Sequence, residues 1–256
     1  MAKGDPVMSK AERTKSARER IKQQQEAAAV RDRRKKVVTY ITAGVVAVAA
    51  VGAGWWYTAS QTASEEAGGE APVTVQADGS AVMAQPGVTA PVVDIYEDFQ
   101  CPACQELERV SGQTFKNLAA EGKAKVVFHP ITIFSDEPLK SNSVRAANAT
   151  RCIADGKQWL AFHDLLFKNQ PPEGSVGFTP EQLQQWGKDA GVTAPDFASC
   201  VTSEKHGEAH LANSKKVGDA QDLKHTPTVK LNGTEIPGET AFRPQQLRDA
   251  VTEAAK

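Results

Sequence analysis

The stretch that decides the fold is "YEDFQCPACQEL", residues 96–107. It ends a run of apolar and aromatic residues, "PVVDIYEDF", that is short enough for a β-strand. After the cysteines, apolar residues recur at spacings near 3.6, the period of a helix: Leu107, Val110, Phe115 and Leu118. Gly122 then stands where a left-handed C-cap belongs. The pattern predicts a strand and a helix that meet at two cysteines.

Downstream of this helix, "KAKVVFHPITIF" at 123–134 predicts a second buried strand, parallel to the first with a right-handed crossover. Residues 137–223 then change to a helical pattern, which includes Thr179 as the N-cap of a capping box. Strand signals return in "TPTVKLNGTEIPG", where Asn232-Gly233 predicts a tight hairpin. An amphipathic helix, "FRPQQLRDAVTEAAK", follows. This order predicts an α/β sheet interrupted by a helical insertion.

The two cysteines of "CPAC" are expected to differ in acidity. The thiolate is the reactive form of cysteine, and unpaired N–H groups and the macrodipole at a helix N-terminus favour it. Cys101 takes that position, and Pro102 suits the first turn because the N–H that it lacks would be unpaired there. Cys104, one turn in, is expected to be buried and less acidic. We expect Cys101 to exchange with a disulfide partner and Cys104 to resolve the mixed disulfide.

A metal site is the main alternative for these cysteines, and an inert structural bridge is another. Structural zinc needs four ligands, usually in two paired clusters, whereas Cys152 and Cys200 each stand alone. His206 and His210 have suitable spacing, but we expect them on the solvated face of a helix. The pattern therefore favours a redox pair. For Cys152 and Cys200 we favour a structural disulfide between two helices, with a second redox pair or free thiols as alternatives.

Charge is distributed unevenly along the chain, although its net value is −1. Residues 1–36 hold twelve Lys or Arg and five Asp or Glu, and residues 37–57 hold no charge. About 20 apolar residues span a bilayer, basic residues mark its cytoplasmic side, and aromatic residues such as Trp55, Trp56 and Tyr57 favour its interface. We expect an uncleaved anchor rather than a cleaved signal peptide, and an orientation signal rather than a nucleic-acid-binding arm. The domain beyond it would be extracytoplasmic, where disulfides persist.

These patterns divide the chain into five parts. They are a basic cytoplasmic tail (1–36), a transmembrane anchor (37–57), a flexible linker (58–73), an α/β domain in two pieces (74–136 and 224–256) and the inserted helical domain (137–223).

Two motifs, "DFQCPAC" at 98–104 and "TPTVKLNG" at 226–233, carry a family resemblance. From about residue 74 to 256 the chain resembles DsbA-type thiol:disulfide oxidoreductases of the thioredoxin superfamily, and is similar to membrane-anchored forms of actinobacteria. The resemblance implies a thioredoxin-like fold and a cis Pro227 beside Cys101. It also implies that the backbone of Thr226 pairs with an extended substrate segment. The resemblance further implies that a Cys152–Cys200 bridge recurs in actinobacterial relatives with a similar helical domain.

The chain departs from the family pattern at three positions. Family members often carry an acid six positions before the first cysteine, where this chain has Ile95, with Asp94, Glu97 and Asp98 nearby. The strongest oxidants of the family carry a histidine at the position of Ala103. Because alanine cannot donate a hydrogen bond to the Cys101 thiolate, we expect the thiolate to be less stabilised and the protein to be a milder oxidant. His225 replaces a frequent glycine, where it could influence Cys101 or occupy a loop; we favour the loop.

We therefore expect a membrane-anchored, extracytoplasmic enzyme that introduces disulfides into exported proteins through Cys101 and Cys104, with Asp98, Pro102, Ala103 and His225 beside them. We expect no bound cofactor, a monomer, reduced exported proteins as substrates, a VKOR- or DsbB-like membrane protein as redox partner, and no nucleic-acid partner. Two alternatives stay open. One is a reductase or isomerase of the same fold, and the other is a metal- or peptide-binding module.

Overall fold

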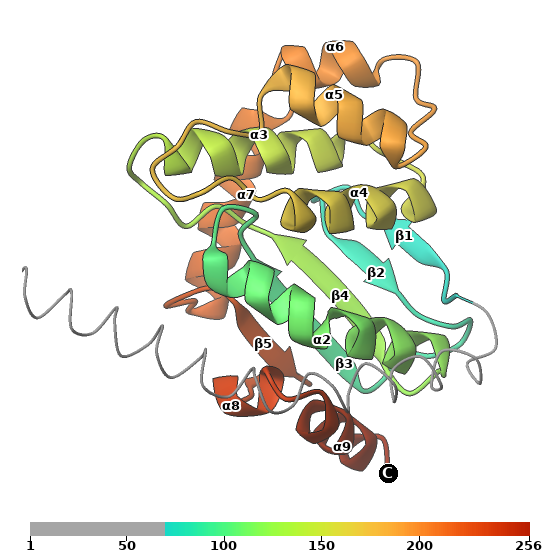
Figure 1. Ribbon diagram of the computed structural model, residues 1–256. Helices are drawn as coiled ribbons and strands as arrows, with labels where there is room; N and C mark the ends of the chain where they lie inside the picture. Colours follow the sequence, from blue (N-terminus) through green and yellow to red (C-terminus); the bar gives the residue numbers. More distant parts are fainter. Residues whose placement is uncertain (1–69) are drawn as a thin grey trace, which may run out of the picture. The chain divides into compact units, whose positions relative to one another are not determined.

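The computed structural model describes residues 70–256, which contain a mixed six-stranded sheet in the order β1-β2-β4-β3-β5-β6 (Figure 1). Only β3 and β4 run parallel; the other neighbours are antiparallel. The strands are β1 (Val73–Val75), β2 (Ala81–Met83), β3 (Val92–Glu97), β4 (Lys125–Pro130), β5 (Thr228–Leu231) and β6 (Thr234–Glu235).

The predicted strand–helix–strand unit is confirmed. Helix α2 (Pro102–Ala120) joins β3 to β4, which pair in a register that places Ile95 opposite Phe128. Gly122 adopts φ +68°, and the N–H groups of Gly122 and Lys123 donate to the last carbonyls of α2. This left-handed C-cap ends the helix where the sequence predicts it. The unit brings the cysteines to the end of the central strand.

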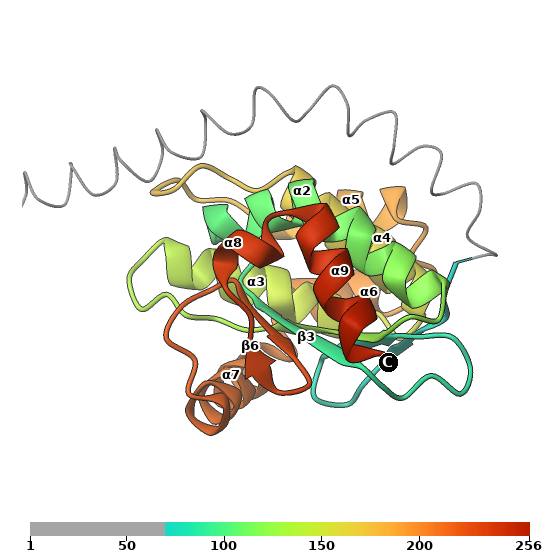
Figure 2. The same ribbon diagram turned by 90° about the horizontal axis from the view of Figure 1, so that it is seen from below.

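Five helices follow β4 in the chain before β5 begins. They are α3 (Leu139–Arg151), α4 (Gly156–Lys168), α5 (Pro180–Asp189), α6 (Phe197–Thr202) and α7 (Gly207–Gln221). The capping box predicted at Thr179 is present, because its side chain accepts from Gln182 N–H and the Gln182 side chain accepts from the Thr179 N–H. In Figure 1, α5 and α6 lie beyond α3 and α4 from the sheet. Figure 2 shows α2 and α9 over one side of the sheet and α7 on the other.

The last part of the described chain returns to the sheet. Strands β5 and β6 form the predicted hairpin, in which Asn232 and Gly233 adopt the positive φ angles of +50° and +81°. The sequence pattern missed a short helix, α8 (Gly238–Ala241), which precedes α9 (Pro244–Ala254). Leu247 and Val251 of α9 are fully buried and anchor this helix beside α2.

The core lies between the sheet and α2 and α4. Apolar burial of this kind contributes about 25 cal/mol for each Å² removed from water and is the main stabilising term of the fold. Its densest part is a set of packed rings: Phe99, Phe128, Trp159, His163 and Phe167. His163 is the one imidazole among these rings, and none of its surface is exposed.

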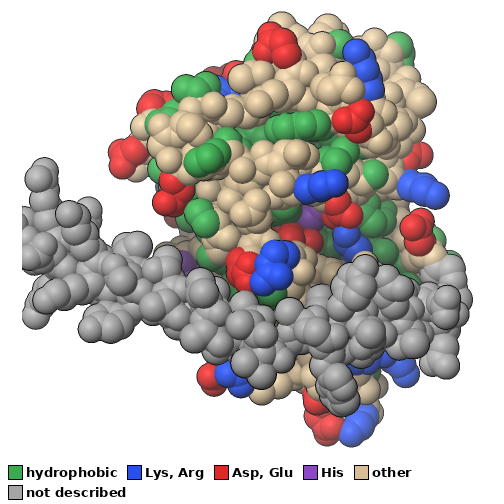
Figure 3. All heavy atoms as spheres, viewed as in Figure 1, with side chains coloured by type: hydrophobic (Ala, Val, Ile, Leu, Met, Phe, Trp, Pro, Cys, Tyr) green, Lys and Arg blue, Asp and Glu red, His purple; other side chains and the backbone are tan. Residues whose placement is uncertain are grey.

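The predicted anchor, residues 37–57, lies outside the described residues, as do the basic tail and most of the linker. Between residues 70 and 256, every helix is too short or too polar to cross a bilayer. On the part of the surface that Figure 3 displays uncovered, acidic and basic side chains are interspersed rather than gathered by sign.

Candidate active site

Cys101 is the N-cap residue of α2, and Pro102 follows at its first turn. Only 6% of the Cys101 surface is exposed. The pKa of its thiol is lowered from 9.0 to about 6, first by a hydrogen bond from the Cys104 thiol, against the opposing effect of burial. The nearby Thr226 side chain and the backbone N–H groups of Cys104 and Ala103 lower this pKa further. A helix N-terminus with these donors stabilises a thiolate near neutral pH.

Cys104 behaves in the opposite way. It is fully buried, and burial raises the pKa of its thiol well above 9.0, with a further contribution from the negative charge on Cys101. Its Sγ accepts a hydrogen bond of 3.5 Å from the backbone N–H of Asp98. Both cysteines are free thiols here, and the two residues between them, Pro102 and Ala103, are exposed. The pair thus combines one acidic thiol with one that holds its proton.

The Thr226–Pro227 segment lies against Cys101, and its peptide bond is cis, as the family resemblance implies. The Cys101 thiol donates to the Thr226 carbonyl oxygen at 3.4 Å. The Thr226 hydroxyl is buried and has no hydrogen-bond partner among the described residues, so it is available to donate to a Cys101 thiolate. This places a backbone segment and a hydroxyl directly beside the reactive sulfur.

His225 lies in the loop before this segment, and its side chain is 60% exposed. Its Nδ1 donates to the Pro227 carbonyl at 3.1 Å, and its Nε2 lies 3.3 Å from Glu235. These contacts hold the ring on the β5–β6 side of the loop.

Asp98 is fully buried directly before the CPAC turn. Its Oδ1 accepts from the Gln100 N–H and from the Ser143 hydroxyl at 2.5 Å, and its Oδ2 accepts from the Ile133 N–H. Burial raises the pKa of this carboxyl to about 6 even though the three donors oppose the shift. A buried acid therefore lies beside the cysteines although the usual family position holds Ile95.

A second buried group, which the sequence did not predict, lies below the cysteines. Oxygens of Glu97 and Glu108 and a nitrogen of His163 lie within 4.8 Å of one another. His163 Nε2 is 2.7 Å from Glu97 Oε1. Glu108 is one helical turn after Cys104 on α2, so their side chains lie on the same face of the helix. The Glu97 Oε2 and Glu108 Oε1 atoms are buried and have no partner in residues 70–256.

The charges in this group support one another. Burial favours a neutral His163, but Glu97, Asp164 and Glu108 outweigh it and raise its pKa to about 10. Burial raises the pKa of Glu108 to about 7, partly offset by His163. His163 Nδ1 lies 3.2 Å from Asp164, which forms an ion pair of 2.6 Å with Lys116. The group therefore connects the interior beside Cys104 with charged side chains near the surface.

Metal binding was the alternative for the CPAC pair. In the described part of the chain, two groups of side chains have the spacing of metal ligands, and neither includes Cys101 or Cys104. One is the Glu97, Glu108 and His163 group. The other contains Cys152 and Cys200, which are joined to each other by a disulfide of 2.04 Å.

The expectation that His206 and His210 lie on a solvated helix face is wrong for His210. His210 is 1% exposed, and its Nε2 lies 2.9 Å from the Thr132 hydroxyl and 3.2 Å from the Ser214 hydroxyl. Burial lowers its pKa to about 4. Helix α7 turns this face toward α3 and the end of β4, which the spacing of the two histidines alone does not reveal.

Comparison with known proteins places these features in a wider context. Residues 87–253 match the model of a protein family described as thioredoxin. The oxidised crystal structure of DsbA from Mycobacterium tuberculosis is 31% identical, with 72% of this chain and 92% of that one covered and a TM-score of 0.58. The thiol-disulfide oxidoreductase MdbA of Actinomyces oris is 25% identical, with 71% and 91% covered and the same TM-score, 0.58.

Among curated proteins, a Rickettsia bellii protein, whose name assigns it provisionally to the protein-disulfide oxidoreductases, is 28% identical over 90 residues. The match spans 35% of this chain and 35% of that protein, so the chain aligns with about a third of this relative.

Proposed function

The chain belongs to the thioredoxin family, among its DsbA-like thiol:disulfide oxidoreductases, and on that premise we propose that it introduces disulfide bonds into exported proteins. The observation that carries this proposal is the contrast between the Cys101 thiol, with a pKa of about 6, and the Cys104 thiol, with a pKa well above 9.0. A stabilised Cys101 thiolate favours the reduced enzyme, which makes the oxidised enzyme an electron acceptor.

The reaction begins with the oxidised enzyme, in which Cys101 and Cys104 form a disulfide. A substrate thiolate attacks Cys101 Sγ, a new S–S bond forms between them, and Cys104 leaves as a thiolate. A second substrate thiolate then attacks the substrate sulfur of the mixed disulfide and releases Cys101 as a thiolate. The substrate gains one disulfide and loses two electrons, which the cysteine pair accepts.

The departing Cys104 needs a proton, because a thiol with a high pKa is a poor leaving group. Two carboxyl groups nearby hold protons close to neutral pH. These are Asp98, with a pKa of about 6, and Glu108, one turn along α2, with a pKa of about 7. We assign them the role of supplying this proton, with Glu97 and His163 connecting Glu108 to Asp164 and Lys116.

Substrate recognition is assigned to the loop of Thr226 and Pro227. A substrate segment that pairs with the Thr226 backbone would lie within reach of Cys101, because the Thr226 carbonyl is 3.4 Å from its sulfur. Binding through the main chain depends little on the side chains of the substrate, which suits an enzyme that acts on many exported proteins.

The proposed location is the outer face of the cytoplasmic membrane, with the N-terminus inside. It is supported by the charge-free run at 37–57 and by the basic residues before it. Reoxidation of the Cys101–Cys104 pair would fall to a VKOR- or DsbB-like membrane protein, without a cofactor bound to this monomeric chain. Labelling of single cysteines placed before and after residues 37–57 in intact cells tests this topology. Labelling from outside at the N-terminal position would contradict it.

The test of the oxidase is refolding of a reduced, multi-cysteine substrate by the full-length protein. Wild type should restore the activity of the substrate faster than Cys101→Ser, and equal slow recovery would exclude the assignment. The equilibrium of the pair with a glutathione buffer separates an oxidase from a reductase, because a strongly reducing potential would favour the reductase.

A further inference from the structure

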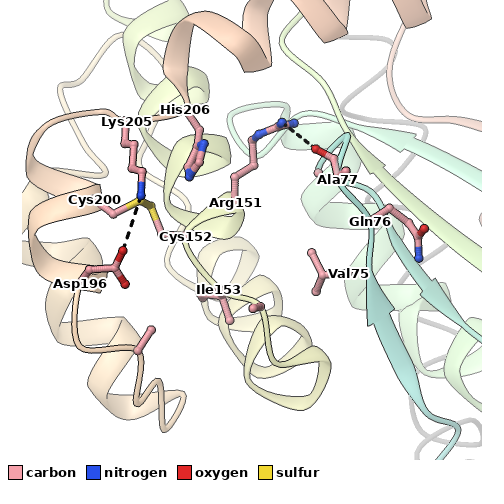
Figure 4. A pocket seen from close by; sticks show the side chains of 13 residues that line it. Val75, Gln76, Ala77, Arg151, Cys152, Ile153, Asp196, Cys200, Lys205 and His206 are labelled. Carbon is pink, nitrogen blue, oxygen red and sulfur yellow. Dashed lines mark hydrogen bonds and ion pairs between the residues drawn. A yellow bond between two sulfur atoms is a disulfide. The ribbon is translucent and has the colours of Figure 1, made fainter.

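A second sulfur site lies away from the CPAC turn. A cavity of about 440 Å³ opens beside the Cys152–Cys200 disulfide, between the helices that it joins and the loop before β2. Both sulfur-bearing residues line it, together with Arg151, Lys205 and His206. Figure 4 shows the His206 ring between the disulfide and the Arg151 side chain. The volume falls within the range of pockets that hold small molecules.

The two sulfurs are not equally accessible. Cys152 is partly exposed, whereas Cys200 is only 4% exposed. An incoming nucleophile would therefore meet Cys152 first, and Cys200 would be the leaving sulfur. A nitrogen of His206 lies within 4.8 Å of both sulfurs and offers a polar neighbour to that leaving group.

Charge around the cavity favours an anion. Arg151 and Lys205 bring two positive charges, and the one acid that lines the cavity, Asp196, lies 3.6 Å from Lys205. Arg151 is held in place by the carbonyl oxygens of Ala77 and Asp78, and its Nε is buried with no partner in the described residues. The positive charges also lower the pKa of His206, after burial itself, so its ring stays neutral at neutral pH.

We propose that this cavity is a thiol-exchange site, at which a small anionic thiol opens the Cys152–Cys200 bridge. The thiolate of the ligand attacks Cys152 Sγ, the Cys152–Cys200 bond breaks, and a mixed disulfide forms on Cys152. Cys200 leaves as a thiolate and takes a proton from water in the cavity. A second thiol molecule releases the ligand as its own disulfide, so the bridge gains the two electrons that the ligand loses.

Opening the Cys152–Cys200 bridge would affect the active site through α3. Cys152 is the C-cap of this helix, and Ser143, nine residues earlier, donates to Asp98. Asn142 on the same helix donates to Gln100, next to Cys101. With the bridge closed, the Ser143 hydrogen bond lowers the pKa of Asp98. Loosening of α3 would weaken this hydrogen bond, so the pKa of Asp98 would rise. Asp98 would then be neutral more often, and the pKa of Cys101 would fall.

The exchange is tested on the full-length Cys101→Ser/Cys104→Ser protein, in which the bridge is the remaining cysteine pair. The probes are mercaptoacetate, 2-mercaptoethanol and cysteamine, which are anionic, neutral and cationic. Each rate is divided by the rate of the same thiol with bis(2-hydroxyethyl) disulfide, which removes differences in intrinsic reactivity. Mass mapping of unreduced peptides locates the adduct, and circular dichroism checks that the fold persists.

We expect an adduct on Cys152 with a free Cys200, and a normalised rate about threefold higher for mercaptoacetate than for cysteamine, in line with partly exposed charge pairs. Added salt and Lys205→Gln should both remove this preference, whereas Lys123→Gln, at an exposed lysine that does not line the cavity, should keep it. Equal normalised rates, an adduct on Cys200, or no adduct while the fold is intact would each overturn the proposal.

The effect on Cys101 rests on the proposed function and is tested separately, in Cys104→Ser. Alkylation of Cys101 against pH is followed by peptide mass with the bridge closed and after mercaptoacetate treatment. We expect a lower midpoint with the bridge open, and an unchanged midpoint would exclude the coupling through α3. Because the exchange test lacks the CPAC thiols, its failure would leave the oxidase proposal standing.

Discussion

The thiol of Cys101 lies 3.4 Å from the carbonyl oxygen of Thr226, although 125 positions separate the two residues in the chain. They meet because β3 and β5 are antiparallel neighbours in the sheet, so the end of β3 and the start of β5 share one edge. One strand delivers the reactive sulfur and the other delivers a backbone carbonyl beside it. The sheet thus aligns the nucleophile with the segment proposed to hold the substrate.

The acidity of Cys101 makes the stability of the reduced protein depend on pH. Its folded pKa of about 6 lies below the value of 9.0 for a free thiol, so its contribution is fully present above pH 9.0 and is lost as pH falls through 6. The contribution is about 1.4 kcal/mol at pH 7 and about 0.4 kcal/mol at pH 6. Urea unfolding of wild type and Cys101→Ser, both reduced, measures it, and a difference that does not vary between these pH values would contradict the shift.

Removal of Cys104 should trap substrates. In Cys104→Ser the mixed disulfide on Cys101 lacks its resolving thiol. Substrate adducts that a reductant cleaves should therefore accumulate and be visible on non-reducing gels. Cys101→Ser is the matched control and should give none, because Cys104 is fully buried and keeps its proton. Adducts of equal amount in both variants would mean that Cys101 is not the attacked sulfur.

Glu108 is expected to influence the release of Cys104. Glu108→Gln removes a carboxyl with a pKa of about 7 and should slow mixed-disulfide formation about tenfold, which is less than a positioned acid or base usually contributes. It should also remove the change of rate with pH near 7. Stopped-flow measurements with a reduced peptide follow both effects.

Glu106→Gln is the matched control for that variant. Glu106 lies on the same helix but pairs with Arg109 at the surface, at 2.7 Å. Its pH profile should equal that of wild type, and so should that of Glu108→Gln if Glu108 only fills space.

Two buried histidines should give opposite responses to pH. The pKa of His163, raised to about 10 from 6.5, contributes stability that is fully present below pH 6.5 and is lost as pH rises through 10. The pKa of His210, lowered to about 4, makes stability fall as pH drops from 6.5 to 4, by an amount on the order of 3 kcal/mol. Denaturant unfolding across both ranges tests the two signs in one protein.

Single substitutions separate the contributions of His163 and His210 to the free energy of unfolding. His163→Gln leaves the Glu97 carboxylate buried without its partner and should cost about 3–5 kcal/mol, part of which Glu97→Gln recovers. His210→Asn should abolish the loss in acid and leave the alkaline range unchanged. A His163→Gln protein as stable as wild type would mean that the Glu97–His163 ion pair makes no net contribution.

The sequence alone was sufficient for the features that depend on local pattern. Apolar periodicity, the Gly122 C-cap and the Asn232-Gly233 hairpin predicted the β3–α2–β4 unit and the β5–β6 turn, and all are present. The partners of buried polar residues depend on tertiary packing, which periodicity does not encode. His163 occupied an apolar helix face and Glu97 ended a strand, yet neither position indicated that the two side chains meet. His210 was misplaced for the same reason.

The exposure of Pro102 and Ala103 between two buried cysteines has a consequence for engineering. Side chains at these two positions extend into solvent, so exchanging them disturbs none of the packed interior. The redox potential of the cysteine pair can thus be adjusted there without changing the packed core, for instance by Ala103→His. The same scaffold could supply a graded series of oxidants for producing secreted proteins.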